Sequence, residues 1–99
     1  MKAGGGTLKI TQEIHYYVYI IRCKDGSYYT GYAKDVKKRF EMHKKGRGAR
    51  YTKMHEPEKL VYVKEFGSRS EAMKRERKIK RLSHSKKRQL ITEDDGKNS

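Results

Sequence analysis

The chain has 99 residues, with 26 lysines and arginines against 12 acidic residues, and a formal net charge of +14. Its length suits one domain, and an apolar content of 33% is too lean for a large core, so some of the eight tyrosines should be buried. No segment can span a membrane, residues 1–14 lack a secretory apolar stretch, and the lone Cys23 excludes an internal disulfide. We therefore expect a cytoplasmic domain with a polyanionic partner and without a membrane contact.

Two segments carry the positive charge. Residues 34–53 hold nine basic and two acidic side chains, and residues 69–88 hold ten basic and two acidic ones. Two solvated, lysine-rich helix faces would explain this pattern as solubility alone. Because the rest of the chain is nearly neutral, the two blocks favour a binding footprint for nucleic acid.

The first half of the chain predicts a hairpin. Residues 1–14 are expected to form a flexible leader. Residues 16–21 are aromatic and β-branched on both alternating faces, which is typical of a strand covered on two sides. Lys24, Asp25 and Gly26 supply a turn, and residues 28–32 form the return strand.

A helix and a loop follow the hairpin. The helix is expected from Asp35, as N-cap, to Lys45, with Gly46 ending it. Residues 46–57, rich in glycine and basic side chains, are expected to form a loop. Residues 60–63 predict a third strand.

The second half is expected to be mainly helical. Ser68 and Glu71 have capping-box spacing, so a helix should start near Ser68 and run to about Leu82. Ser83 or Ser85 is expected to cap a short helix that ends near Ile91, and residues 92–99 should form a disordered polar tail. The domain is then residues 15–91, of the α+β type within the α/β class: a small three-stranded antiparallel or mixed sheet flanked by helices, in the order β-β-α-β-α-α.

Two polar side chains share the apolar face of the first predicted helix. Val36, Arg39, Phe40 and His43 follow the i, i+3, i+4, i+7 spacing of one face. Arg39 and His43 could lie at the edge of this face and reach water. Alternatively, they bring nitrogen donors to the inner side of the helix.

Glu76 breaks the pattern of the second predicted helix. The apolar face consists of Ala72, Met73, Ile79 and Leu82, and Glu76 is its only charged member. An inward carboxylate needs a partner. That partner is either a neighbouring cation in a salt bridge or a hard metal ion such as Mg²⁺, which often uses one or two protein carboxylates plus waters.

The order of these motifs resembles the GIY-YIG nuclease superfamily, specifically its small, stand-alone, single-domain bacterial (UPF0213-type) members. Tyr17-Val18-Tyr19 stands at the first motif and Tyr29-Thr30-Gly31 at the second. The segments 35–43, 46–52 and 70–80 resemble the family's arginine helix, the following loop and the helix with the acidic metal ligand. The resemblance covers residues 16–90, although Tyr17 replaces the family's first glycine and Thr30 its central residue.

The resemblance implies an endonuclease that cleaves nucleic acid, with DNA favoured, by using one divalent ion, Mg²⁺ or Mn²⁺. Glu76 would hold the metal, Arg39 would stabilise the transition state, Tyr19 would act as general base or orient water with help from Tyr29, and His43 would orient water or contact phosphate. The expected nucleic-acid-binding residues are Lys38, Lys45, Arg47, Arg50, Tyr51 and Lys80. Nothing indicates an obligate protein partner. The alternative is a basic DNA- or RNA-binding protein that has the nuclease fold but weak or no catalysis.

The proposed roles of Tyr19 and Tyr29 constrain the turn between them. With a two-residue turn, antiparallel pairing would put Tyr19 and Tyr29 on opposite faces of the sheet. A three-residue loop with Gly26 left-handed would pair Tyr19 with Gly31, and both tyrosines would then share one side. We therefore predict a positive φ at Gly26 and expect that shared side to meet Arg39 and Glu76.

Overall fold

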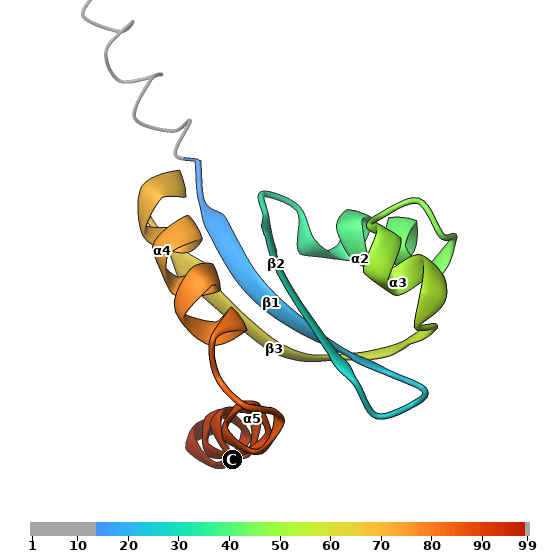
Figure 1. Cartoon of the computed structure of the whole chain (residues 1–99). Helices are drawn as coiled ribbons and strands as arrows, with labels where there is room; N and C mark the ends of the chain where they lie inside the picture. Colours follow the sequence, from blue (N-terminus) through green and yellow to red (C-terminus); the bar gives the residue numbers. More distant parts are fainter. Residues whose placement is uncertain (1–13, 99) are drawn as a thin grey trace, which may run out of the picture.

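Three antiparallel strands form the centre of the protein (Figure 1). The structure, a computed structural model, describes residues 14–98, so the predicted leader lies outside the described residues except for Ile14. The strands are β1 (Tyr16–Cys23), β2 (Tyr28–Ala33) and β3 (Pro57–Phe66), in the order β2-β1-β3. β1 is central because its side chains are apolar on both faces, as its sequence predicts.

Helices cover both faces of the sheet. Figure 1 shows α2 (Val36–Lys44) and α3 (Arg50–Met54) on one side, and α4 (Arg69–Lys80) and α5 (His84–Asn98) on the other. The core is accordingly divided into two clusters. The α4 and α5 side contains Val18, Ile20, Tyr62, Ala72, Ile79 and Ile91. The α2 side contains Tyr19, Ile21 and Cys23, packed against Tyr29, Ala33, Val36, Phe40 and Leu60. The expected α+β class and element order are confirmed, apart from the extra short helix α3.

The predicted caps form as expected. The Asp35 side chain accepts a hydrogen bond from the Lys38 amide at 3.0 Å, and the Ser68 hydroxyl accepts one from the Glu71 amide at 3.2 Å. Gly46 takes a positive φ of 76° directly after the end of α2. These caps fix the ends of the two helices that carry Arg39 and Glu76.

Three element boundaries differ from the prediction. Residues 46–57 are not all loop, because α3 forms within them and buries Thr52. β3 extends beyond residues 60–63 at both ends, since its polar residues lie on an exposed edge strand that still pairs with β1 from Tyr16↔Phe66 to Cys23↔Pro57. α5 continues past Ile91 to Asn98, where a polar tail was expected; Ser99 lies outside the described residues. No helix within residues 14–98 has the length and apolar character to cross a membrane.

The hairpin has the predicted three-residue loop. Cys23 and Ser27 close it, with Cys23 N donating to the Ser27 carbonyl at 2.8 Å, and Gly26 has a φ of 86°. The Asp25 carboxylate accepts hydrogen bonds from both the amide and the hydroxyl of Ser27. The register pairs Tyr19 with Gly31 and Ile21 with Tyr29, so both tyrosines lie on the same face, as predicted.

Candidate active site

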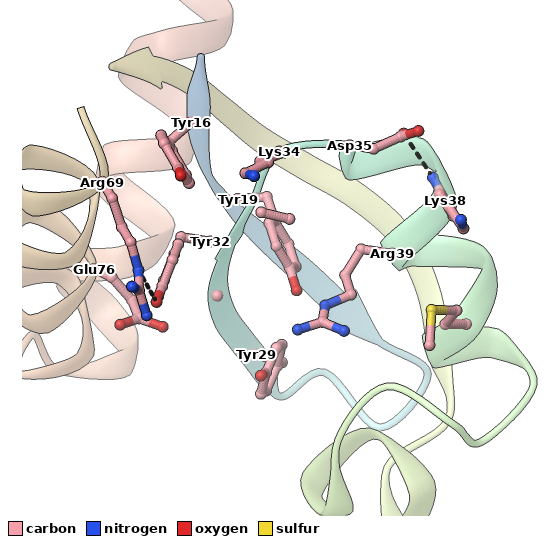
Figure 2. Close-up of a pocket in the computed structure, with 13 residues that line it drawn as sticks. Tyr16, Tyr19, Tyr29, Tyr32, Lys34, Asp35, Lys38, Arg39, Arg69 and Glu76 are labelled. Carbon is pink, nitrogen blue, oxygen red and sulfur yellow. Dashed lines mark hydrogen bonds between the residues drawn. The ribbon is translucent and has the colours of Figure 1, made fainter. Parts of the chain in front are cut away.

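A pocket lies along β2, one of the two edge strands of the sheet, and takes side chains from both helical layers (Figure 2). From the α2 side it receives Tyr19, Tyr29 and Arg39. From the α4 side it receives Glu76 and Arg69. The structure therefore brings Tyr19, Tyr29, Arg39 and Glu76 to one pocket. We had expected all four to meet on one face of the sheet. Glu76 instead comes from the opposite helical layer and reaches the pocket at the edge of β2.

Gly31 makes room for this arrangement. It is paired with Tyr19 across the hairpin, so any side chain at position 31 would lie on the Tyr19 face. A Cβ atom there would lie 2.6 Å from the Tyr19 hydroxyl oxygen and 2.8 Å from its Cζ. The Tyr19 phenol occupies the space that a side chain would need, which lets its hydroxyl reach the pocket over β2.

The Tyr19 phenol is buried but keeps its hydroxyl in a polar contact. The residue is 1% exposed, and its hydroxyl lies 2.9 Å from Nε2 of His43. Burial raises the pKa of Tyr19 well above its ordinary value, the nearby Tyr29 raises it further, and the positive charge of Arg39 opposes both. The phenol is therefore neutral at physiological pH.

His43 lies behind Tyr19 and does not line the pocket. It is 1% exposed, its Nδ1 lies 2.6 Å from the Thr52 hydroxyl, and Gly48 lies directly against its ring. The structure does not bring His43 into the pocket with the other predicted site residues, because its ring is enclosed by protein. Burial, and next the charge of Arg39, lower the pKa of His43, so its imidazole is neutral.

The lowered pKa of His43 predicts a loss of stability in mild acid. The unfolded chain binds a proton near the ordinary pKa of 6.5, whereas folded His43 binds it only at lower pH. The free energy of unfolding should therefore be at its full value above about pH 6.5 and decrease as the pH falls towards the folded pKa. Tyr19, Tyr29, Arg39 and Thr52 surround the ring, and none is a carboxylate that would compensate its charge.

Urea midpoints of the wild type and of His43→Gln, measured at about pH 7.5 and pH 5.5, test this expectation. The wild type should lose more stability between the two values than the variant. An equal loss in both proteins would contradict the assignment of a neutral, buried imidazole.

Glu76 faces the pocket from α4 with a partly shielded carboxylate. Its side chain is 15% exposed, and its Oε2 lies 3.5 Å from the Nζ of Lys80, whose side chain is 52% exposed. Residues 14–98 contain no group of three or more histidine, cysteine or acidic residues that could enclose a metal. A single oxygen ligand in an open, water-accessible pocket fits Mg²⁺, which keeps several waters, and does not fit a site that needs several protein ligands. Both readings of Glu76, metal ligand and ion-pair partner, thus have a structural basis.

The predicted nucleic-acid-binding residues fall into two groups. Lys38 lines the pocket along β2, and exposed Lys80 contacts the Glu76 carboxylate. Arg47 and Arg50 instead line a separate hollow beside α3, together with Lys53 and the two glycines of the loop. Exposed Lys45 caps the end of α2. The 37% exposed Tyr51 stacks on His55 at 4.2 Å and lies 6.0 Å from the Tyr29 ring, so it lies between the two groups.

Several residues of the site were not predicted. Tyr16, Tyr32, Lys34 and Arg69 line the pocket, and Arg69 Nε donates a hydrogen bond to the Tyr32 hydroxyl at 3.3 Å. Because side chains alternate along β2, Tyr32 lies on the face opposite Tyr29, which is the α4 side. This alternation would have indicated Tyr32 as a site residue if the site had been known to span both faces. Thr52 was missed because no pattern in residues 46–57 predicted a helix that would bury it.

Several known proteins are similar to this chain in sequence or in fold. Residues 15–89 match the family model described as the GIY-YIG catalytic domain. A UPF0213 protein of Staphylococcus saprophyticus is 55% identical over 78 residues, which cover 79% of this chain and 95% of that protein. A UPF0213 protein of Staphylococcus aureus is 53% identical with the same coverage. The solution structure of the UPF0213 protein BH0048 from Bacillus halodurans is similar, with a TM-score of 0.52 and 49% identity, over 79% of this chain and 83% of that one.

Proposed function

The chain belongs to the GIY-YIG family, and from this premise we propose that it is an endonuclease that hydrolyses phosphodiester bonds, with DNA as the favoured substrate and one divalent ion, Mg²⁺ or Mn²⁺. The observation that carries the proposal is the pocket at the edge of β2. Four elements bring the side chains of Tyr19, Tyr29, Arg39 and Glu76 into it. The net charge of +14 favours a polyanionic substrate.

Arg39 binds the phosphate under attack. It is an exposed residue of α2 that lines the pocket, and Figure 2 shows its guanidinium between the Tyr19 and Tyr29 side chains. A planar guanidinium donates two parallel hydrogen bonds to phosphate oxygens and stays charged at every physiological pH. It therefore stabilises the extra negative charge of the pentacovalent transition state.

Glu76 holds the divalent ion. When bound, that ion supplies Lewis-acid polarisation of the phosphate and stabilises the charge of the leaving oxygen. When no metal is present, Lys80 neutralises Glu76, with its Nζ 3.5 Å from Oε2 of the carboxylate. The lysine side chain is exposed, so it can move away when the ion binds.

Tyr19 and His43 transfer the proton of the attacking water. The water gives a proton to the Tyr19 oxygen while the Tyr19 hydrogen passes to Nε2 of His43, 2.9 Å away. The water oxygen forms its bond to phosphorus, the bond to the leaving oxygen breaks, and that oxygen takes a proton from solvent. His43 then returns its proton through Tyr19 to solvent, which restores the neutral imidazole. Because Tyr19 accepts one proton as it gives up another, no free phenolate forms, in keeping with its raised pKa.

The second candidate is a nucleic-acid-binding protein without catalysis. The ion pair of Glu76 and Lys80 favours it, because this pair accounts for the carboxylate without a metal. A nicking assay on supercoiled DNA with Mg²⁺, Mn²⁺ or a chelator separates the two functions. Metal-dependent conversion to open circles supports the nuclease, whereas binding without conversion of any DNA or RNA substrate supports the alternative.

Binding should depend strongly on salt and little on base sequence. With the metal removed, about five neutralised phosphates on duplex DNA would give a slope near −4.5 for log K against log salt. Arg47 and Arg50 are exposed on the hollow beside α3, so neutralising both with glutamine should reduce the slope by about 2. Fluorescence anisotropy at a series of salt concentrations measures both slopes.

Lys64→Gln is the matched control, because Lys64 is an exposed residue of β3 outside both basic segments. Its slope should equal that of the wild type. An affinity that hardly changes with salt would contradict binding through backbone phosphates.

A further inference from the structure

A chain of polar contacts leads from the pocket into the α3 layer. It runs from the Tyr19 hydroxyl to Nε2 of His43 at 2.9 Å, and from Nδ1 of His43 to Oγ1 of Thr52 at 2.6 Å. The last contact joins Oγ1 of Thr52 to the Ala49 carbonyl at 3.2 Å. Tyr19, His43 and Thr52 are each at most 2% exposed, so water does not replace these contacts.

The hydrogens in this chain can be assigned from its far end. A carbonyl oxygen only accepts, so the Thr52 hydroxyl gives its single hydrogen to Ala49. The Thr52 oxygen then accepts from His43, which requires the hydrogen of the neutral ring to be on Nδ1. Nε2 is left with a lone pair, and the Tyr19 hydroxyl donates to it.

The opposite assignment would have a different effect on Tyr19. With the ring hydrogen on Nε2, His43 would donate to the Tyr19 oxygen and block the acceptance of the phenol hydrogen. Oγ1 of Thr52 would then donate to Nδ1 and face the Ala49 carbonyl with a lone pair. The two tautomers therefore differ in whether Tyr19 can pass on a proton, and the partner of Nδ1 selects between them.

We propose that Thr52 is a positioning residue for cleavage, which holds His43 in the tautomer with hydrogen on Nδ1 so that Nε2 accepts the hydrogen of Tyr19. This inference rests on the proposed nuclease function and adds the residue that sets the direction of proton transfer. Thr52 acts only through His43 and does not line the pocket.

The surroundings of His43 leave its ring little freedom to turn. Gly48 lies against the ring atoms Nδ1, Cγ and Cε1, and the Tyr29 ring lies at 4.9 Å between centroids. The Ala49 carbonyl that accepts from Thr52 also accepts from the Lys53 amide at 3.1 Å, which ties it to the first turn of α3. Gly48 and α3 thus hold the ring of His43 in place, and the hydrogen bond to Thr52 determines its tautomer.

The first test reads the tautomer directly. Two-bond ¹H–¹⁵N correlation spectra of the full chain distinguish the protonated from the unprotonated ring nitrogen of His43. We expect the Nδ1–H form in the wild type and in Thr52→Ser, which keeps the hydroxyl, and the Nε2–H form or a mixture in Thr52→Val, which keeps the shape but not the hydroxyl. An Nε2–H tautomer in the wild type, or no change in Thr52→Val, would overturn the proposal.

The second test is kinetic. In the nicking assay, Thr52→Val should lower kcat by about 10- to 100-fold, as expected for loss of a partner that orients a functional histidine, with little change in KM. Thr52→Ser should retain near wild-type kcat. Equal losses in both variants, or a loss matched by unfolding in thermal melts, would show a purely structural role and contradict the proposal.

The two tests separate this inference from the function on which it rests. If the wild type has the Nδ1–H tautomer but cleaves no nucleic acid, the nuclease function fails, and with it any role of Thr52 in cleavage. If the wild type cleaves and Thr52→Val cleaves equally well, the nuclease function stands and the role of Thr52 is refuted.

Discussion

Replacement of Glu76 by glutamine should abolish metal-dependent cleavage and leave the domain folded. The neutral amide keeps the shape of the side chain but is a poor ligand for Mg²⁺, so the rate should fall by at least about 1,000-fold. The lost ion pair with Lys80 is an i,i+4 contact to an exposed lysine, and such pairs contribute less than about 1 kcal/mol. The free energy of unfolding should therefore change little.

Glu71→Gln is the control for this variant, since Glu71 is an exposed acid of the same helix that does not line the pocket. It should cleave like the wild type. Thermal melts with and without Mg²⁺ complete the test: the ion should stabilise the wild type and Glu71→Gln but not Glu76→Gln. If Glu76→Gln instead unfolds at clearly lower denaturant and the ion stabilises no variant, Glu76 is a structural ion-pair partner.

Gly31→Ala should remove most activity by displacing Tyr19. The added methyl group would lie 2.6 Å from the Tyr19 hydroxyl and 3.1 Å from the Tyr29 ring, so one or both phenols must shift. A shift of about 1 Å in a reacting group is enough for a 100-fold loss of rate. The overpacking should also cost about 1 to 3 kcal/mol of the free energy of unfolding.

Gly67→Ala supplies the comparison, because a Cβ atom at Gly67 would have no neighbour within 4 Å. This variant should keep its activity and its stability. Nicking rates and urea midpoints of both variants measure these effects on activity and on stability. Wild-type activity in Gly31→Ala would mean that the position of the Tyr19 hydroxyl over β2 is not needed for cleavage.

Much of the fold follows from local signals that tertiary contacts do not override. Asp35 and Ser68 cap their helices as predicted, and Gly26 takes the left-handed conformation that sets the hairpin register. α3 could not be predicted, since its five residues bury only Thr52 and show no apolar periodicity. The end of α5 was missed for the opposite reason: residues 92–98 are polar, yet they continue a helix that Ile91 already anchors to the core.

The site was predicted better by residue type than by placement. Glu76 and Arg39 were singled out because each is a charged residue among the apolar side chains of its helical face, and both line the pocket. The pattern of a single helix does not say which layer it joins, so the approach of Glu76 from the opposite side of the sheet was not foreseen. His43 was correctly placed on the inner face of its helix, but its burial and its bond to Thr52 depend on α3.

The position of the pocket on the β2 edge also bears on self-association. Within residues 14–98, β2 has only one neighbouring strand, and none of its own side chains carries a charge. An uncharged edge strand is an open template for pairing with another chain, and proteins often guard such edges with cations. Lys34, Arg39 and Arg69 line the pocket along this edge, so the charges that favour a phosphate there also repel the edge of a second copy. The side chains that we propose to bind phosphate would thus also protect this edge against aggregation.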